Sequence, residues 1–285
     1  MTNCYADLMT IKRRLGISAE TKWDTDFITW MNTSSRFIDE HTRRWFYVLA
    51  GTRYQNGSDS DHLFTDDILS ITTLKIDADC DGTFEDTYTV DTDYNLVPYD
   101  GYPKTEIEIS SRAGRSYSDF GGNLRKIVQI VGSFGYGNGL SATPYVDSGA
   151  VVNTGNMTDS ASTHALATGK GASFAAGQTI LIGSEQLHIA SISTDTLTFT
   201  LNPTRNQNGT TAAAHTAGDK IYIYQYPATI VEACITQVSQ WYKLATQTGY
   251  TGLGGSADYG GQTVIKGLDP NVKLMLAPFV KRGFV

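Results

Sequence analysis

The hydrophobic pattern of this chain changes its period along the sequence, and this feature constrains the fold more than any other. At both ends apolar residues recur every three or four positions, which is the period of an amphipathic helix. Over residues 48–136, and again over 178–224, many segments alternate apolar and polar residues, as half-buried strands do. The pattern predicts an α+β fold, with a small helical bundle formed by the ends and a β-hairpin or sheet region between them.

Two helices are predicted within the first 46 residues. Asp7 is a suitable N-cap for a short helix, and Gly16 can adopt the left-handed conformation that ends it. A second helix starts near Asp24 or Thr25 and carries a wide apolar stripe. The stripe consists of Phe27, Trp30, Met31, Phe37, Ile38, His41 and Trp45. Such a stripe is typical of a core or a subunit interface.

The middle of the chain predicts two β regions of different character. The strands of the first are Ile68–Ile76, Phe84–Val90, Thr105–Ser110 and Lys126–Val131. Residues 141–224 form the second, a small all-β module that begins with a nearly uncharged, flexible entry, Ser141–Ala176. Its strands are Gln178–Ile182, Gln186–Ile192, Thr196–Leu201 and Lys220–Tyr224.

Helical signals return after the second β region. Pro227 can open a helix, and Thr229 with Glu232 matches a capping box. A last helix, from Asn271 to about Ala277, follows the N-cap and N1 pair Asp269-Pro270.

Charge and cysteine content narrow the class of protein. The net charge of −7 disfavours a protein that coats nucleic acid, which would show a basic surface. The three cysteines lack the spacing of a metal or redox site, so reduced thiols made in a cytoplasm are expected. No signal peptide or membrane-spanning run is apparent, so no membrane association is expected.

The sharpest local motif is acidic and lies between two predicted strands. Asp77, Asp79 and Asp81 stand at alternate positions before Gly82, as in the first half of a calcium-binding loop, and Glu85 falls at the ninth position. The twelfth position is a tyrosine rather than the usual glutamate. The alternative interpretation is an acidic hairpin turn that binds no ion. Calcium is the only cofactor that the sequence suggests.

No catalytic motif stands out elsewhere. The five histidines are scattered, and the glycines at 132–139 are not followed by the helix that a phosphate-binding loop needs. Glu106 and Glu108 are a carboxylate pair of the kind that a hydrolase could use. A basic loop could contact DNA in a channel, or be simply solvated. Its basic residues are Arg112, Arg115, Arg125 and Lys126, with Tyr117 and Phe120 as aromatic neighbours.

Four short segments, in this order, carry a resemblance to a known family. The first two are the K-x-x-L pattern at Lys12–Leu15 and the IDxxxxRxF pattern at Ile38–Phe46. The third is split between Val131–Gly137 and Tyr226–Ala233, a Gly-aromatic segment and a helix opened by proline. The fourth is the ending LMLAPFVKRGF, with Phe279 at the aromatic position. Together they resemble the head–tail connector (adaptor, or head-completion) family of tailed bacteriophages.

The resemblance implies a domain organisation. Residues 1–140 and 225–285 would form the connector core, and residues 141–224 would be a β module inserted in one of its loops. Because removal of the module would restore the family's usual order, Gly139 and Tyr226 are expected to lie close together in space.

The resemblance also implies a structural role rather than an enzyme. The chain would be made in the host cytoplasm and built into the virion neck, as part of a twelve-membered ring that extends the DNA conduit. Its partners would be further copies of itself, the portal protein, a stopper or tail-completion protein and, transiently, the passing DNA. The expected interface residues are Trp30, Phe37, Trp45, Val272, Met275, Phe279, Lys281, Arg282 and Phe284.

Two other classes of function stay open at this point. One is a phage decoration or receptor-binding protein whose β module binds capsid or glycan. The other is a glycan-active hydrolase that uses two of the many carboxylates. Ring formation, alone or on purified portal, separates the connector from both alternatives.

Overall fold

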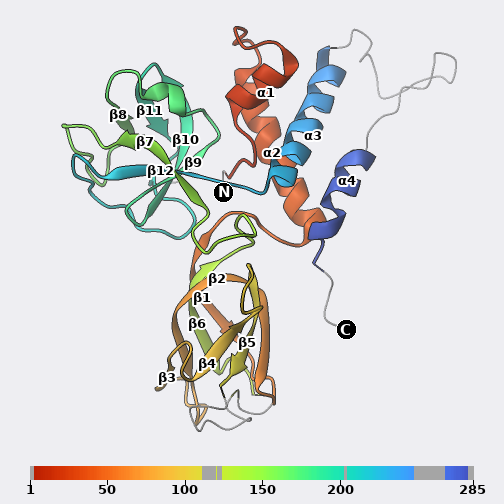
Figure 1. The fold of residues 1–285 in the computed structure, drawn as a ribbon, viewed down its shortest axis with the longest axis vertical. Helices are drawn as coiled ribbons and strands as arrows, with labels where there is room; N and C mark the ends of the chain where they lie inside the picture. Colours follow the sequence, from red (N-terminus) through yellow and green to blue (C-terminus); the bar gives the residue numbers. More distant parts are fainter. Residues whose placement is uncertain (1–2, 111–119, 121–123, 202–203, 247–266, 282–285) are drawn as a thin grey trace, which may run out of the picture. The chain divides into compact units, whose positions relative to one another are not determined.

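The computed structural model describes residues 3–110, 120, 124–201, 204–246 and 267–281. Within these ranges the chain has four α-helices and two antiparallel sheets of six strands, so the predicted α+β class is confirmed (Figure 1). The chain divides into two compact units. One, here called the mixed unit, comprises Met1–Arg44, Val146–Asn206 and Ala212–Val285, and the other, the sheet unit, comprises Trp45–Tyr145 and Gln207–Thr211.

This division groups the residues differently from the expected connector core. The helical ends share a unit with most of the β module, whereas residues 48–136 lie in the other unit. Gly139 and Tyr226 also belong to different units, so their expected proximity stays a prediction. The same holds for the insertion of residues 141–224.

Helix α1 (Leu8–Leu15) has the ends that the sequence predicts. The Asp7 carboxylate accepts a hydrogen bond from the Thr10 backbone N–H at 2.8 Å, which satisfies one of the free amides of the first turn. Gly16 follows with φ +74°, and its N–H donates to the Arg13 carbonyl. Glycine adopts this left-handed conformation without steric cost, so the helix ends there.

Helix α2 (Asp24–Thr42) starts as predicted but ends before Trp45. Its last turn is closed by Arg43, which takes a left-handed conformation with φ +54°. The placement of Trp45 on the helical stripe was therefore wrong. Trp45 lies in the sheet unit and packs, partly buried, against the core of that unit. The buried residues of α2 are Phe27, Met31, Ser34, Ser35, Ile38 and Thr42.

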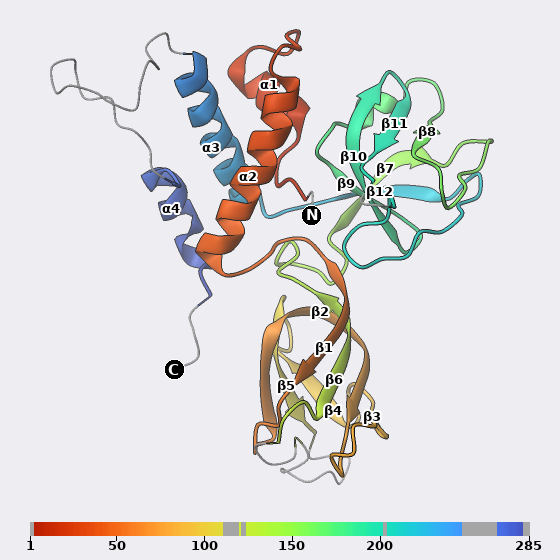
Figure 2. The same cartoon turned by 180° about the vertical axis from the view of Figure 1, so that it is seen from behind.

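Helices α3 (Ala228–Thr246) and α4 (Pro270–Leu276) pack with α2, and α2 lies beside α3 in both views (Figures 1 and 2). Small buried side chains, Ser35 on α2 and Cys234 on α3, meet at the contact, with 3.9 Å between Oγ and Sγ. Asp269 caps α4 as predicted, by accepting from the Asn271 N–H, and a 3-10 turn, Ala277–Phe279, follows. The described cysteines are free thiols, and burial raises the pKa of Cys234 to about 11.

Six strands form the sheet of the mixed unit, in the order β7-β12-β9-β10-β11-β8. They are β7 (Tyr145–Val151), β8 (Thr163–Ala165), β9 (Thr179–Ile182), β10 (Glu185–Ser193), β11 (Thr196–Phe199) and β12 (Lys220–Tyr224). The four predicted strands are confirmed with small shifts of their ends. The prediction of a flexible entry was wrong, because β7 and β8 both lie in Ser141–Ala176. Only one residue of β7 is buried, so the strand shows no alternation that the sequence could reveal.

The N-terminal segment holds this sheet against α1 within the mixed unit. The Leu8 N–H donates to the Ala176 carbonyl at 3.0 Å, and the Thr179 hydroxyl donates to the Asn3 side chain at 3.3 Å. The core of the sheet is a continuous apolar cluster that includes Phe174, Ile180, Leu187 and Leu197.

A histidine inside this sheet predicts a pH dependence. Burial lowers the pKa of His188 from 6.5 to about 4, so the fold favours the neutral ring. The unfolded chain then binds more protons between these two values, and the stability due to neutral His188 is lost as the pH falls from about 6.5 to 4. By linkage, this loss amounts to about 3 kcal/mol of unfolding free energy.

The measurement is urea denaturation of the wild type and of His188→Leu at pH values from 4 to 7. The unfolding free energy of the wild type minus that of the variant should fall by about 3 kcal/mol between pH 7 and pH 4. The comparison is needed because burial raises the pKa of Asp39 to about 7, which changes stability in the opposite direction over the same range. A difference independent of pH would contradict the assignment.

The sheet unit contains the second sheet, in the order β1-β6-β2-β5-β4, with β3 also paired to β2. Its strands are β1 (Leu49–Gln55), β2 (His62–Ile76), β3 (Asp86–Tyr88), β4 (Tyr94–Val97), β5 (Lys104–Ile109) and β6 (Val128–Phe134). All four predicted segments contain a strand, but β2 begins earlier than predicted, at His62 instead of Ile68, and β3 covers only part of Phe84–Val90. The strands β1 and β4 were not foreseen. The predicted acidic turn joins β2 to β3, which pair antiparallel with Ile76 opposite Asp86.

Candidate functional site

The two segments that carry most of the family resemblance come together in the helices of the mixed unit. Arg14 of α1 makes two hydrogen bonds to the Glu232 carboxylate of α3, at 2.7 and 2.8 Å. Hydrogen bonding to Arg14 lowers the pKa of Glu232. The predicted capping box is therefore replaced by a contact between helices, because this carboxylate is engaged by α1.

Two further contacts join the same segments. The rings of Phe37 on α2 and Trp241 on α3 meet edge to face, with their centroids 6.1 Å apart. The backbone N–H of Lys281 donates to the Thr42 carbonyl at 2.8 Å, which ties the end of the described chain to the end of α2. Residues more than 200 positions apart are thus neighbours in one unit.

The expected interface residues differ in how accessible they are. Val272 is fully buried and belongs to the core of the helices. Trp30, Phe37, Trp45, Met275, Phe279 and Lys281 are half-buried. Arg282 and Phe284 lie outside the described residues. The most exposed apolar side chain of α4 is Leu274, which is 75% exposed and was not among the expected interface residues.

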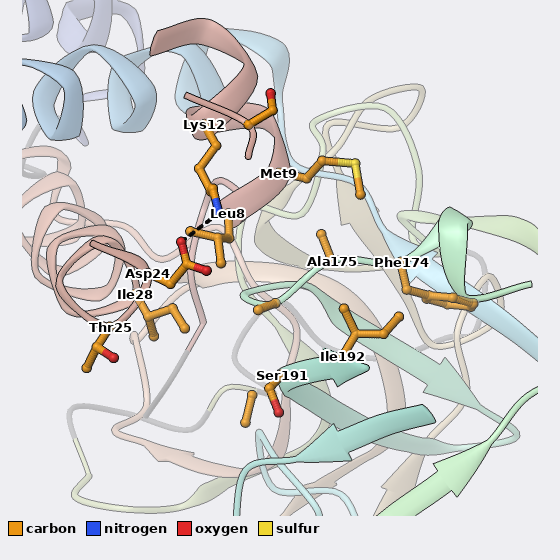
Figure 3. Close-up of a pocket in the computed structure, with 13 residues that line it drawn as sticks. Leu8, Met9, Lys12, Asp24, Thr25, Ile28, Phe174, Ala175, Ser191 and Ile192 are labelled. Carbon is orange, nitrogen blue, oxygen red and sulfur yellow. Dashed lines mark hydrogen bonds and ion pairs between the residues drawn. The ribbon is translucent and has the colours of Figure 1, made fainter. Parts of the chain in front are cut away.

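A pocket of about 530 Å³ lies between α1, α2 and the sheet of the mixed unit (Figure 3). Lys12 and Asp24 form an ion pair of 2.8 Å at one side of it, and Phe174, Ser191 and Ile192 line the other. Most of the lining is apolar. Among the described residues that line it, Asp24 supplies the one carboxylate, and Lys12 already pairs with it.

The carboxylate pair on β5 is already engaged by neighbouring side chains. Glu106 contacts the ring of His62 on β2, and this hydrogen bond raises the pKa of His62. Glu108 accepts a hydrogen bond from the Tyr99 hydroxyl, which raises the pKa of that phenol. Sequence reasoning missed these pairings because His62 and Glu106 become neighbours only through the pairing of β2 with β5.

The acidic motif forms a loop, residues 77–85, between β2 and β3. One oxygen from each of Asp77, Asp79, Asp81 and Glu85 lies within 4.8 Å of the others, so this loop is where the described chain could hold a metal ion. Asp77 is buried and the other three are exposed.

The basic loop is described only in part. Arg112 and Arg115 lie outside the described residues, whereas Arg125 and Lys126 are exposed. The Lys126 ammonium lies 4.7 Å from the centre of the Tyr54 ring, a cation–π distance. Phe120 was expected among the exposed aromatics of this loop, but it is fully buried in the core of the sheet unit.

The chain was compared with protein-family models, curated proteins and solved structures. No protein-family model, no curated protein and no solved structure matches the chain. None of the described helices combines the length and the apolar character that crossing a membrane requires. A functional proposal for this chain therefore rests on its own residues and their arrangement.

Proposed function

We propose that this chain is a structural virion protein that joins the portal of a tailed bacteriophage to its tail, as one subunit of a ring that extends the DNA conduit. In this proposal α1 to α4 form a small helical bundle that is part of the connector core, and residues 141–224 are an inserted all-β module. The proposed role is mechanical, to extend the DNA conduit, and it requires no catalytic residue.

The observation that supports the proposal most is the packing of the helical ends. The resemblance to the connector family lies mainly in residues 8–46 and 226–284, and these two segments are far apart in the sequence. The ion pair between Arg14 and Glu232 and the contact between Phe37 and Trp241 join them within one unit. A chance likeness in two unrelated segments would not require them to be neighbours.

The exposed side of α4 is the part of the bundle best suited to contact another protein. Leu274 projects with 75% of its surface exposed, and Met275 of α4 and Phe279 of the following 3-10 turn are half-buried. Contacts between identical subunits in a ring are heterologous, so such a surface would bind a different face of the next copy or the portal. Interface cores are rich in apolar, Met and aromatic side chains of this kind.

Assembly of the purified chain tests this function. We expect a ring, alone or on purified portal, that light scattering detects as a defined oligomer and electron microscopy as a closed ring. Leu274→Glu should abolish assembly, because it places a charge in the interface while leaving the fold intact at an exposed position.

The matched control is Leu140→Glu, the same change at a leucine that is 83% exposed in the sheet unit. This variant should assemble as the wild type does. A chain that stays monomeric and does not bind purified portal would contradict the proposal. Binding of the monomer to intact capsids or to a surface polysaccharide would then favour a decoration or receptor-binding protein.

A further inference from the structure

The acidic loop between β2 and β3 gathers four carboxylates in a small volume. One oxygen of each of Asp77, Asp79, Asp81 and Glu85 lies within 4.8 Å of the other three. Calcium binds protein oxygens at about 2.3–2.6 Å, so two ligands of one ion can be at most about 4.6–5.2 Å apart. Each pair of these oxygens is therefore close enough for both members to contact one calcium ion.

Asp77 supplies an independent observation that points to a cation. Its side chain lies at the end of β2, and the residue is only 4% exposed. Oδ2 accepts a hydrogen bond from the Gly82 N–H at 3.0 Å, but Oδ1 is buried and has no hydrogen-bond partner in the described part of the chain. A buried carboxylate oxygen without a donor is costly, and coordination of a metal ion removes that cost.

Nothing else in the described residues neutralises this cluster. None of the four carboxylates forms an ion pair with a described lysine or arginine, although such pairs occur elsewhere in the chain. The loop is closed locally, because the Asp81 side chain accepts a hydrogen bond from the Thr83 N–H at 2.7 Å and Gly82 takes φ +95° at the turn. Four carboxylates are thus held close together with no lysine or arginine partner among the described side chains.

We propose that the acidic loop binds one Ca²⁺ ion, with Asp77 Oδ1, Asp79, Asp81 and Glu85 as protein ligands and water in the remaining positions. The usual bidentate carboxylate is missing, since the twelfth position is Tyr88, which pairs with Leu74 and is buried in the sheet core. The affinity should therefore be modest, with a dissociation constant of about 10⁻⁴ to 10⁻³ M. Magnesium should bind more weakly, because it gives up its water ligands reluctantly.

Bound calcium would connect the two strands of the hairpin. Asp77 directly follows β2, and Glu85 directly precedes β3. An ion that binds only this arrangement stabilises the folded loop by mass action. This inference does not depend on the proposed role in the phage neck, because it concerns a hairpin within the sheet unit alone.

Calorimetric titration of the full chain, freed of metal by a chelator, tests the site with CaCl₂ and with MgCl₂. We expect one calcium per chain and a clearly weaker response to magnesium. Asp79→Asn and Asp81→Asn should each lower the calcium affinity about tenfold or more, and the double variant should show no binding. Both side chains are exposed, so these changes leave the fold intact.

Asp86→Asn is the matched control. It removes one exposed carboxylate at the start of β3 that is not part of the cluster, so its affinity should stay within about twofold of the wild type. Thermal melting gives a second readout. Calcium at about ten times the dissociation constant should raise the melting temperature of the wild type by about 2–4 °C, and that of the double variant not at all.

Two results would overturn the proposal. The first is the absence of both heat and a melting shift up to about 10 mM calcium, a concentration above the weakest affinity expected. The second is an equal response of the wild type and the Asp79→Asn/Asp81→Asn variant, which would place the calcium elsewhere. Neither result depends on ring assembly, so the two proposals can fail separately.

Discussion

Replacement of Glu185 by alanine is expected to lower the free energy of unfolding of the mixed unit by about 3–5 kcal/mol. Glu185 is fully buried at the start of β10, and its carboxylate accepts from Arg205 at 2.9 and 3.0 Å and from the His215 ring at 2.7 Å. Arg205 itself is 1% exposed. Without the carboxylate, a buried guanidinium loses its counter-charge, and desolvation of that charge is no longer offset.

Urea denaturation followed by tryptophan fluorescence measures this effect, because Trp23, Trp30 and Trp241 all lie in the mixed unit. The informative control is the double variant Glu185→Leu/Arg205→Met, which replaces both charges by apolar groups of similar size. It should be much closer to the wild type than the single variant is, since no unpaired charge stays buried. A loss below about 1 kcal/mol for Glu185→Ala would mean that Arg205 finds water or another partner.

The second large effect is expected in the sheet unit, at the centre of the pairing between β2 and β6. Alanine at Gly132 would place its Cβ 2.1 Å from the Ser70 carbonyl oxygen and 3.0 Å from the Ile71 Cα. Both atoms belong to the backbone of β2, so no side-chain rotation can relieve the clash. Gly132→Ala should therefore separate the two strands locally and cost about 4 kcal/mol or more, among the largest effects of single substitutions.

The structure offers a closely matched control for Gly132. Gly51 of β1 lies directly opposite it in the pairing of β1 with β6, yet a Cβ at Gly51 would meet no atom within 4 Å. Gly51→Ala should thus be neutral or slightly stabilising, because alanine loses less backbone entropy on folding than glycine. Thermal melting of both variants decides the point. Equal melting temperatures would show that the backbone of β2 shifts at this position to accommodate the added methyl group.

Local signals in the sequence predicted the ends of several elements correctly. Asp7 and Gly16 mark the two ends of α1, and Asp269-Pro270 marks the start of α4. These ends are predictable because a cap depends on side-chain and backbone atoms only a few residues apart. The β2–β3 hairpin was predicted for the same reason, since two alternating strands flank a short acidic turn. The four residues of the candidate calcium loop were likewise identified from their spacing alone.

Long-range contacts decided what the local pattern left open. Trp45 continues the helical period of α2 but lies outside the helix and packs on the core of the sheet unit, and Phe120, which was expected in an exposed basic loop, is buried in the same core. The strands β7 and β8 show little apolar alternation and exist because distant strands pair with them. In each case, the partner that stabilises the residue is far away in the sequence.

The sequence by itself therefore determined the α+β class, most helix ends, the main strands and the identity of the acidic loop, since these depend on composition, period and neighbouring residues. Only the tertiary structure decided that Arg205 and Glu185 are buried together, that Leu274 is exposed on α4 and that the Asp77 carboxylate is shielded from water. Burial is a property of the whole fold, because the atoms that exclude water from a residue come from segments far apart in the chain.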